Sequence, residues 1–589
     1  MGDDGGSRRS EGERTVTTET GVELAGLVEA LEFERERFET PGMAVAVIRD
    51  RRVVLARGFG LRDVAARLPA TERTLFAIGS TTKAFTATLI AALVGDGLLE
   101  WDRPVREYLP WFRLHDRVAT ELITVRDLLC HRSGLPRHDL VWYANPDMSR
   151  RELVERLRHL EPNRSFREVW QYNNLMFITA GYLAGELLGS SWEEGVRERL
   201  LGPLSMADTC FSLTQARRAA DWSRGYRERD EGPEELAPKD FPLSGPAGSM
   251  YSSVTDLARW MEVNLGAGRV GEREVIAPSA LRTLHSPAMV VADQETMWPE
   301  RFGIGYGLGW ALESYRGHRL VHHGGAIEGY TAKVVLAPEA GAGAIVLTNH
   351  YGTALPDVAC YRIMDELLGS APLPWGKRMR DLQVAARKGG REATERRRSA
   401  AADAPPAHPE SAYAGEYHHP GYGSLRVTAG DDGLHARLGD LDLDMTHRHF
   451  ETWDVTLTIL ETPFPLTFTT DADGEVTSLA VPFEPSVAPI VFQRQPPAEL
   501  SDPDRLATFV GTYAMGPLRA RVRLEETHLS VELINVQTLP LTPATDRTFV
   551  VKGRPSIRIQ FVVDNGRAVE MEIQPGVGVF TREPENYPV

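Results

Sequence analysis

Residues 76–90 read Phe76-Ala-Ile-Gly-Ser80-Thr-Thr-Lys83-Ala-Phe-Thr-Ala-Thr-Leu-Ile90. An apolar segment meets Gly79, and the run beyond it predicts a buried helix that begins near Ser80. Residues three apart on a helix face the same way, so Lys83 is expected beside the Ser80 hydroxyl. A serine becomes a nucleophile when a neighbouring base takes its proton, and a lysine whose pKa is lowered by burial can be that base. The alternative is that Ser80 only caps a core helix whose first turn carries a solvated lysine.

A second segment with polar side chains is Gln171-Tyr172-Asn173-Asn174-Leu175, which stands just ahead of a helix predicted over 177–188. The Tyr172 phenol can relay a proton, and the Asn174 amide can hold a substrate carbonyl. Alone, the pattern also fits a loop tyrosine that is packed into the core.

A third segment, Val321-His322-His323-Gly324-Gly325-Ala326, stands before a strand predicted over 331–336. Its glycines would let a substrate backbone approach that strand closely. In isolation the segment also fits a glycine-rich hairpin with an exposed histidine. Three such segments in this order and spacing are far more specific than any one of them, and together they favour a catalytic site.

In this combination the chain resembles the serine β-lactamase and penicillin-binding-protein superfamily, over roughly residues 25–370. Ser-x-x-Lys, here Ser80 and Lys83, is a motif of that superfamily. Further stretches without chemistry look like the branch that contains class C β-lactamases, carboxypeptidases, D-aminopeptidases and related esterases. These stretches are Thr124–Pro136, Pro203–Thr209, Pro246–Ala258 and Gly305–Trp310.

The resemblance implies that Ser80 attacks a carbonyl carbon and becomes acylated. Lys83 and Tyr172 would share the transfer of the serine proton to the leaving group. The N–H groups of Ser80 and Ala326 would form the oxyanion hole, and water or another nucleophile would release the acyl group. The candidate residues are Ser80, Lys83, Tyr172 and His323 for catalysis, and Asn174, Gly325 and Ala326 for substrate binding.

The third motif departs from the common pattern, because His323 stands where β-lactamases and carboxypeptidases usually carry the lysine of Lys-Thr-Gly or Lys-Ser-Gly. In those enzymes the lysine helps to attract the carboxylate of the substrate, whereas a histidine is largely neutral near neutral pH. The D-aminopeptidases are similar to this chain in carrying His-x-Gly. An aminopeptidase also needs a carboxylate for the substrate ammonium; Glu328 is a candidate, although a glutamate in a surface turn is the simpler interpretation.

Strands at both ends of the first 370 residues, with helices between them, predict one antiparallel sheet assembled from distant parts of the chain. This is an α+β arrangement with flanking helices rather than an alternation of strands and helices. The predicted strands span 43–48, 53–59, 331–336 and 344–348, and the predicted helices include 21–38 and 357–368.

Beyond residue 375 the chain changes character, first to an arginine-crowded connector, helical or frayed, that ends in a Pro-rich linker, and then to β-structure. A weak repeat, Tyr413-Ala-Gly-Glu-Tyr417 and Phe509-Val-Gly-Thr-Tyr513, favours two small barrels over one larger β-domain. The D-aminopeptidases resemble the chain in having two lipocalin-like barrels, and in that family a loop of the last barrel reaches the active site; residues 540–546 could play this part. The predicted domains are a hydrolase domain over 20–375, a linker over 376–409, and β-barrels over 410–496 and 503–589.

Composition excludes several other classes of protein. A formal net charge of -16 argues against nucleic acid as a partner. The three cysteines form no disulfide framework, and no metal or cofactor motif is present. The N-terminal residues lack the apolar stretch of a signal peptide and no apolar run is long enough to span a membrane, so we expect a cytoplasmic protein without a membrane partner. Assembly into a homo-oligomer stays open.

The predicted function is a serine hydrolase that forms an acyl-enzyme on a small-molecule or short-peptide amide, similar to a D-aminopeptidase or amidase. An esterase or an amide-forming transacylase would use the same residues. A β-lactamase fits less well, because the motif lysine and an export signal are missing. A penicillin-binding module without turnover is the non-enzymatic alternative, and the intact nucleophile and base count against it.

Overall fold

The computed structural model describes residues 21–237, 239–291, 298–399, 404–457, 463–472, 474–526, 528–533, 538–544 and 546–584. The chain divides into two compact units. The first comprises Met1–Ala401 together with Phe483–Ala488, and the second comprises Ala402–Pro482 and Pro489–Val589.

An antiparallel sheet forms the centre of the first unit, in the strand order β10-β11-β12-β13-β14-β1-β2-β3. Its middle joins the two ends of the domain, because β1 pairs with β14 in a register that sets Met43 opposite Thr348. The prediction of one sheet assembled from distant segments is confirmed. The strands are β1 (Gly42–Arg49), β2 (Arg52–Asp63), β3 (Leu68–Pro69), β10 (Arg301–Tyr306), β11 (Ala311–Tyr315), β12 (His318–Ile327), β13 (Tyr330–Ala337) and β14 (Ala342–Thr348).

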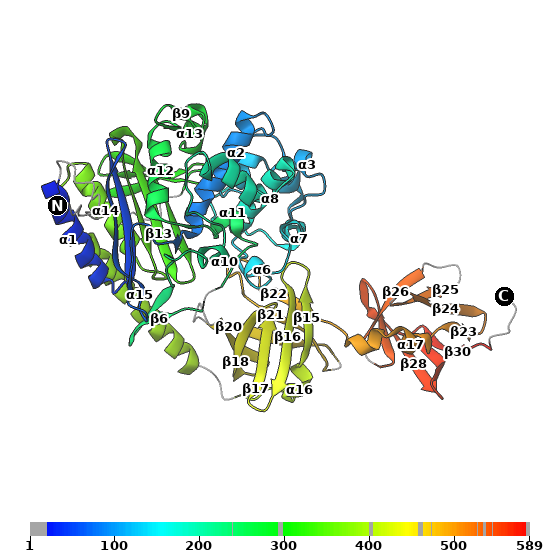
Figure 1. Ribbon diagram of the computed structural model, residues 1–589. Coiled ribbons are helices and arrows are strands. Elements are labelled where there is room, and N and C mark those ends of the chain that lie inside the picture. The colour runs from blue at the N-terminus through cyan, green and yellow to red at the C-terminus, as the bar shows by residue number, and fades with distance from the viewer. Residues whose placement is uncertain are drawn as a thin grey trace, which may run out of the picture. The chain divides into compact units, whose positions relative to one another are not determined.

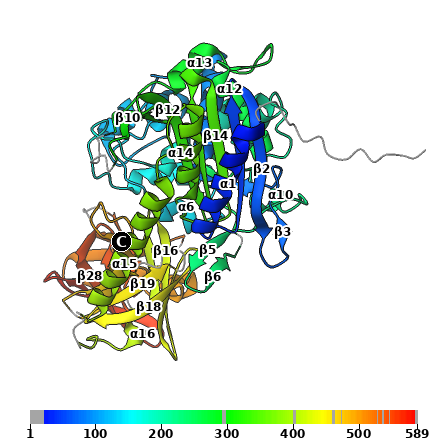
Figure 2. The ribbon, with the colours of Figure 1, turned by 90° about the vertical axis from the view of Figure 1, so that its left-hand side faces the viewer.

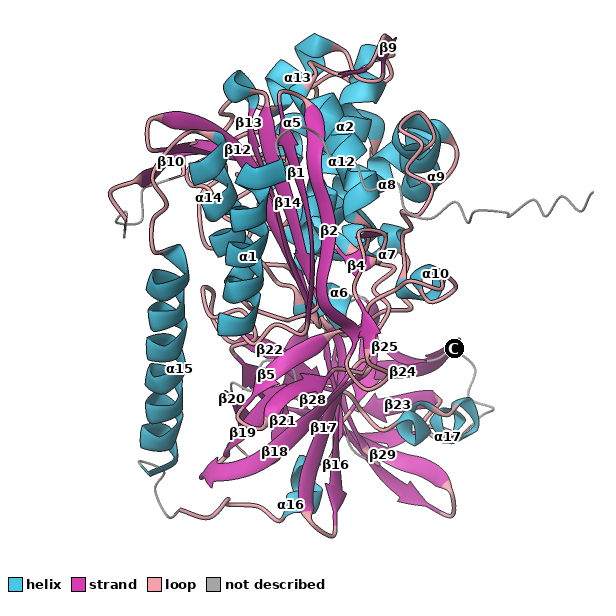
Figure 3. Cartoon of the chain, turned by 60° about the vertical axis from the view of Figure 1, so that its left-hand side comes forward, coloured by secondary structure: helices cyan, strands magenta, loops and turns pink. Residues whose placement is uncertain are grey.

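Helices cover both faces of this sheet. On one face α1 (Gly21–Arg37) packs against α14 (Leu355–Leu367), as Figure 1 and Figure 2 show. On the other face α12 (Val254–Leu265) lies against β1 and β14, and α2 (Thr82–Gly95) and α8 (Asn174–Leu188) lie beyond it (Figure 3). The central strands are therefore buried on both sides, which explains their continuous apolar sequences.

The helix that follows the nucleophile, α2, spans Thr82–Gly95 and is preceded by a short 3-10 turn over Gly79–Thr81. Gly79 has a φ of +51°, in the left-handed region that glycine adopts without strain. The chain can therefore turn sharply from β4 (Phe76–Ala77) into the helix. Most residues of α2 are apolar and nearly all of them are buried, as expected of a core helix.

The helix predicted over 177–188 begins three residues earlier, as α8 (Asn174–Leu188). The side-chain oxygen of Asn173 accepts a hydrogen bond from the Met176 N–H, which would otherwise lack a partner in the first turn. This cap places Asn174 at the helix N-terminus, where α8 packs against α2.

The third segment lies inside a strand rather than ahead of one. His323, Gly324 and Gly325 belong to β12, which pairs with β13 and sets Gly325 opposite Ala332. The strand predicted over 331–336 is β13. Glycine and histidine break the apolar alternation that would indicate a strand, so the pattern does not show β12.

The residues predicted as a linker begin with a long helix, α15 (Trp375–Ser399). Arg380 and Arg387 of this helix both pair with Glu228, at the hairpin of β5 (Tyr226–Arg229) and β6 (Gly232–Glu235). These two arginines thus fasten α15 to the hairpin of β5 and β6. Neither this helix nor any other in the described ranges is both long and apolar enough to cross a membrane. The boundaries at 20–375, 376–409, 410–496 and 503–589 stay predictions.

Two closed barrels of eight strands each make up the second unit. The prediction of two barrels is confirmed, and a single larger β-domain is excluded. The first barrel contains β15 (Gly415–His419), β16 (Gly423–Gly430), β17 (Gly433–Leu438), β18 (Leu441–His449), β19 (Thr452–Leu457), β20 (Pro463–Thr470), β21 (Val476–Val481) and β22 (Ile490–Arg494). The second contains β23 (Gly511–Met515), β24 (Leu518–Glu525), β25 (His528–Leu533), β26 (Thr538–Pro543), β27 (Thr548–Val551), β28 (Arg554–Asp564), β29 (Arg567–Gln574) and β30 (Gly578–Arg582).

The weak sequence repeat marks the same hydrogen bond in both barrels. The Tyr417 hydroxyl donates to the Tyr413 carbonyl at 2.8 Å, and the Tyr513 hydroxyl donates to the Phe509 carbonyl at 2.7 Å. Each tyrosine is fully buried, so its hydroxyl needs a partner. The repeat therefore reflects the same packing requirement at the start of each barrel.

Candidate active site

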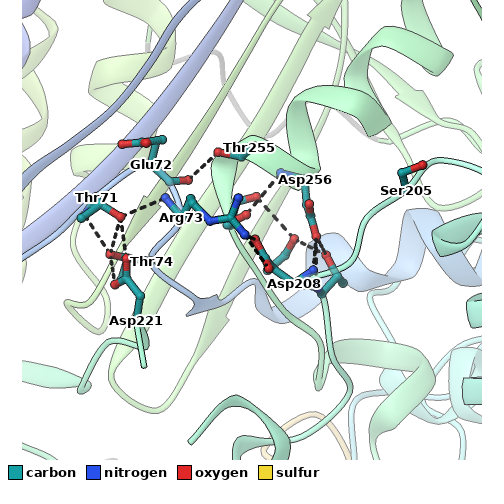
Figure 4. Close-up of polar contacts among 12 residues, drawn as sticks. Thr71, Glu72, Arg73, Thr74, Ser205, Asp208, Asp221, Thr255 and Asp256 are labelled. Atoms are coloured by element: carbon teal, nitrogen blue, oxygen red, sulfur yellow. Dashed lines mark hydrogen bonds and ion pairs between the residues drawn. The ribbon is translucent and has the colours of Figure 1, made fainter. Parts of the chain in front are cut away.

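Two aspartates hold the segment that leads to the nucleophile (Figure 4). The hydroxyls of Thr71 and Thr74 donate to the carboxylate of Asp221, at 2.6 and 2.5 Å. Arg73, which lies between the two threonines in sequence, pairs with Asp208 at 2.7 Å. The chain therefore enters β4 and the nucleophile turn from an anchored position.

Two glycines let the nucleophile turn and β12 meet backbone to backbone. A Cβ atom on Gly79 would stand 2.7 Å from the Ala326 nitrogen, and one on Gly325 would stand 2.0 Å from the Ile78 oxygen and 3.1 Å from the Ser80 nitrogen. Both distances to the backbone of Ile78 and Ala326 are too short for any side chain. Gly325 thus lets the nucleophile turn approach β12 closely, and this approach brings the backbone nitrogens of Ser80 and Ala326 near each other. A part of Gly325 in substrate binding stays a prediction.

Lys83 is fully buried beside the nucleophile. Its Nζ lies 3.0 Å from Ser80 Oγ, 2.6 Å from Asn174 Oδ1 and 2.8 Å from the Ala247 carbonyl oxygen. All three oxygens accept hydrogen bonds from the lysine in this structure. A neutral amine has two N–H bonds, which the two carbonyl oxygens can take, so its lone pair would be available for the serine proton. Burial, with the charge of Arg137 as a smaller cause, holds the pKa of Lys83 well below its ordinary value.

Tyr172 lies over the same lysine, with its ring centroid 4.9 Å from Lys83 Nζ. Burial raises the pKa of its phenol well above the ordinary value, although a hydrogen bond with Ser80 and the charge of Arg137 oppose the rise. Tyr172 therefore keeps its proton at neutral pH, and the lysine is the better candidate for the base.

Asn174 links the lysine to a charged pair that the sequence did not reveal as functional. Its Nδ2 donates to Asp139 Oδ1 at 2.8 Å, while its Oδ1 accepts from Lys83. Asp139 in turn accepts from Arg137 at 2.6 Å, and the Arg137 guanidinium lies 5.2 Å from the Tyr172 ring centroid. The amide predicted to hold a substrate carbonyl thus keeps one N–H bond for that purpose.

The sequence does contain a signal for Arg137 and Asp139. They follow directly on Thr124–Pro136, a stretch that resembles the superfamily but carries no chemistry of its own. Nothing in that stretch shows which distant residues its end will meet, so their place beside Asn174 becomes visible only in three dimensions.

A residue from far along the chain also fixes the loop that contains Arg137 and Asp139. Glu484, in the segment Phe483–Ala488 that belongs to the first unit, accepts a hydrogen bond from the His138 N–H at 3.1 Å. The other oxygen of this buried carboxylate accepts from the Ser486 hydroxyl at 2.6 Å. Sequence analysis singled out residues 540–546 for such a part instead; Thr538–Pro543 forms β26 of the second unit, and a role for it at the site stays a prediction.

His323 is buried and neutral. Its Nδ1 lies 2.6 Å from the Gly324 carbonyl oxygen, which only accepts, and its Nε2 lies 2.9 Å from the Tyr306 hydroxyl. Nδ1 therefore carries the proton and Nε2 accepts one from the tyrosine. Burial lowers the pKa of His323 to about 3, so this motif brings no positive charge to the site.

Nothing in the described ranges groups three or more His, Cys, Asp or Glu residues around a metal position. The three cysteines, Cys130, Cys210 and Cys360, are free thiols. Burial raises the pKa of Cys130 to about 12 and that of Cys210 to about 11, so these thiols are poor nucleophiles.

A serine at the start of a core helix, a buried lysine one turn on, a Tyr-x-Asn at a second helix and a glycine-bearing strand on an antiparallel sheet together define the serine β-lactamase and penicillin-binding-protein superfamily. The chain belongs to the Beta-lactamase family, whose model matches residues 31–368. A second family model, a domain of unknown function (DUF3471), matches residues 399–494.

Relatives and a solved structure agree with this assignment. The chain is 30% identical over 485 residues to an unguisins hydrolase of Aspergillus campestris, covering 77% of this chain and 88% of the relative. It is 25% identical over 327 residues to protein flp of Staphylococcus aureus, covering 54% of this chain and 61% of that protein. An octameric penicillin-binding protein homologue from Pyrococcus abyssi has a similar fold, with a TM-score of 0.52 and 24% identity over 80% of this chain and all of that one. The protein is a serine hydrolase of this superfamily.

Proposed function

We propose that the protein hydrolyses small amide or short-peptide substrates through an acyl-enzyme on Ser80, with a preference similar to that of D-aminopeptidases. One observation carries the proposal: Lys83 is fully buried with its Nζ 3.0 Å from Ser80 Oγ, and its other partners are neutral oxygens, so the amine can be neutral and accept the serine proton. Such an amine is the base that a serine nucleophile needs.

The residues can divide the reaction as follows. Lys83 takes the Ser80 proton as the serine oxygen attacks the carbonyl carbon. The N–H groups of Ser80 and Ala326 hold the oxyanion, where one donor typically contributes about 2.7–4 kcal/mol to the transition state. The proton then passes from Lys83, with Tyr172 as the neighbouring donor, to the leaving amine, and water attacks the acyl-enzyme by the same route in reverse.

The preference for an amide without a carboxylate next to the scissile bond is supported by His323. Its ring is neutral and both ring nitrogens are bonded within the protein. A substrate carboxylate would therefore find no cation at this motif. Two Aspergillus relatives are named unguisins hydrolases, which supports hydrolysis as the reaction.

The nucleophile is tested by intact-mass analysis after treatment with a fluorophosphonate. The wild-type protein is expected to gain one adduct, and Ser80→Ala is expected to gain none. An adduct that persists in the variant would place the nucleophile elsewhere.

The substrate class is tested by incubation with D-alanine p-nitroanilide alongside p-nitrophenyl acetate. Release of nitroaniline that depends on Ser80 is the expected result. Turnover of the ester with no release from the anilide would replace the amidase with an esterase, and nitrocefin hydrolysis at the rate of a dedicated enzyme would replace it with a β-lactamase.

A further inference from the structure

His131 lies in the stretch Thr124–Pro136, which the proposed reaction does not use. The residue is fully buried, and its φ of +51° or more, at +60°, lies in the left-handed region that is uncommon for a residue with a side chain. Such a conformation persists only where the surrounding structure holds the residue in place. What holds His131 is the segment around Tyr172.

Two hydrogen bonds join His131 to the residues on either side of Tyr172. Its backbone carbonyl oxygen accepts from the Gln171 N–H at 2.8 Å, and its Nδ1 accepts from the Asn173 N–H at 3.1 Å. The imidazole also packs on the Tyr172 ring, with the two centroids 4.4 Å apart and the planes inclined by 33°. His131 therefore holds the backbone on both sides of the tyrosine and contacts its ring.

The bond to Asn173 requires a neutral imidazole. Because Nδ1 accepts a proton from the Asn173 N–H, the ring proton is on Nε2. Burial holds the pKa of His131 well below its ordinary value, so Nδ1 remains an acceptor at neutral pH.

The second ring nitrogen indicates that packing alone does not explain a histidine at this position. Among the residues that the structure describes, the buried Nε2 has no hydrogen-bond partner. The rings of Trp170, Phe177 and Tyr306 lie against the imidazole, with centroids 4.7–5.9 Å away. A buried N–H without a partner is unfavourable, and a phenylalanine would fill a similar space without one. A phenylalanine could not accept from Asn173, so that bond accounts for the histidine.

The segment that His131 holds carries the proton donor of the proposed reaction. The Tyr172 ring lies over Lys83, with its centroid 4.9 Å from Nζ, and its phenol forms a hydrogen bond with Ser80. Displacing a group in such a site by about 1 Å can lower the rate by about 10²-fold. The position of the phenol therefore matters for the reaction.

We infer that His131 is a positioning residue: its bond to the Asn173 N–H and its ring hold the Tyr172 phenol where it can protonate the leaving group. The inference rests on the proposed function, because it concerns the proton transfer assigned to Tyr172. In that step the phenol gives its proton to the leaving oxygen or nitrogen and takes up the proton that Lys83 received from Ser80. No further reactant is needed.

Two esters with different leaving groups test the inference. The p-nitrophenolate ion is a weak base that leaves readily without a proton, whereas phenolate is more basic and depends more on a proton donor. We compare kcat/KM for phenyl acetate and p-nitrophenyl acetate, with active protein counted from fluorophosphonate labelling so that unfolded molecules do not contribute. His131→Phe keeps a ring and loses the acceptor. It is expected to lower kcat/KM for phenyl acetate about tenfold more than kcat/KM for p-nitrophenyl acetate.

His131→Asn is the conservative variant, because asparagine tolerates the left-handed conformation and its Oδ1 can replace Nδ1 as the acceptor. It is expected to recover most of the lost ratio. His131→Gln, whose amide oxygen extends past the position of Nδ1, is the second loss variant in case His131→Phe does not fold.

His350→Phe is the matched control for the loss of a buried histidine. His350 is also buried, its Nδ1 lies 3.1 Å from the Thr40 hydroxyl oxygen, and its Nε2 has no partner among the described residues. The control is expected to keep the wild-type ratio of the two esters.

Tyr172→Phe should change the ratio in the same direction, and adding His131→Phe should change it no further, because both act through one phenol. Equal losses for the two esters in His131→Phe, or no recovery in His131→Asn, would overturn the inference and leave the nucleophile intact. An unchanged ratio in Tyr172→Phe would remove the tyrosine from the proton transfer and overturn the inference with it. Failure of the wild-type protein to label would overturn the proposed function itself.

Discussion

Two lysines of the catalytic unit are buried to nearly the same degree and have opposite chemistry. Lys83 is 0% exposed and Lys333 is 3% exposed. Lys83 contacts only neutral oxygens, and its pKa is held well below the ordinary value. Lys333, on β13, pairs with the Asp357 carboxylate at 2.5 Å. Burial acts to lower the pKa of Lys333 too, but Asp357 and the neighbouring acidic groups outweigh it and raise the pKa.

Burial by itself therefore does not make a lysine a base. The partners decide: carbonyl and hydroxyl oxygens stabilise a neutral amine, whereas a carboxylate stabilises the ammonium. Four substitutions test this difference between the two lysines, and they are ordered from the largest expected effect to the smallest.

Replacing the base, Lys83→Met, is expected to lower kcat/KM for p-nitrophenyl acetate by about 10²–10⁴-fold. The same change should raise the thermal unfolding midpoint. The pKa of Lys83 is lower in the folded than in the unfolded chain, so between the two values the unfolded chain binds more protons, and the lysine lowers the stability at neutral pH. Activity within tenfold of the wild type would show that Lys83 is not the base.

Giving the base a carboxylate partner, Asn174→Asp, should make Lys83 resemble Lys333. Asn174 Oδ1 lies 2.6 Å from Lys83 Nζ, so a negative charge there raises the lysine pKa. The neutral form then appears only at higher pH, and the acid limb of the pH–kcat/KM profile should move up by at least about 1 unit. Activity near neutral pH should fall about tenfold or more and recover in alkaline buffer. An unmoved limb, with activity lowered equally at all pH values, would contradict this account.

Removing the paired lysine, Lys333→Met, is expected to destabilise the fold and spare the chemistry. The Asp357 carboxylate loses its partner, which typically costs about 1–3 kcal/mol. Its side chain remains 40% exposed, so solvent screening favours the lower end of that range. Chemical denaturation should show the loss, and Asp357→Asn in the same chain should restore much of it. A drop in kcat measured on fully folded protein would give Lys333 a role that its position does not suggest.

Arg137→Gln should have the smallest effect. The Arg137 charge lowers the Lys83 pKa, so its removal should raise that pKa and move the acid limb to higher pH. The shift should be below about 1 unit, because the arginine side chain is 55% exposed and its charge is screened. A pH–kcat/KM profile in low salt measures it, and a limb that moves to lower pH would contradict the sign.

Much of the fold follows from local patterns. Apolar runs predict β1, β13 and β14, because strands covered on both faces need continuous apolar side chains. β12 is not predicted, because its sequence does not alternate between apolar and polar residues. Its glycines allow the close approach of the nucleophile turn, and His323 forms a hydrogen bond with Tyr306. The start of α8 is missed for a smaller reason: Asn173 caps the helix before its apolar pattern begins.

The residues of the candidate site likewise divide into those that local sequence predicts and those that it does not. Ser80 and Lys83 are predicted because a helix fixes the spacing between them. The pair of Arg137 and Asp139 is not predicted, because its meeting with Asn174 depends on the tertiary fold. The role of Glu484 cannot be predicted from local sequence either, because its carboxylate accepts a hydrogen bond from the backbone of a residue more than three hundred positions earlier.

The segment that carries Glu484 also bears on how the chain can be divided. Phe483–Ala488 is counted with the catalytic unit, although it connects β21 to β22 of the first barrel. A shortened chain that stopped in the predicted linker would keep Ser80 and Lys83 but lose the carboxylate that receives the His138 N–H. The first unit is therefore discontinuous in sequence, because it includes a stretch that is translated after most of the first barrel.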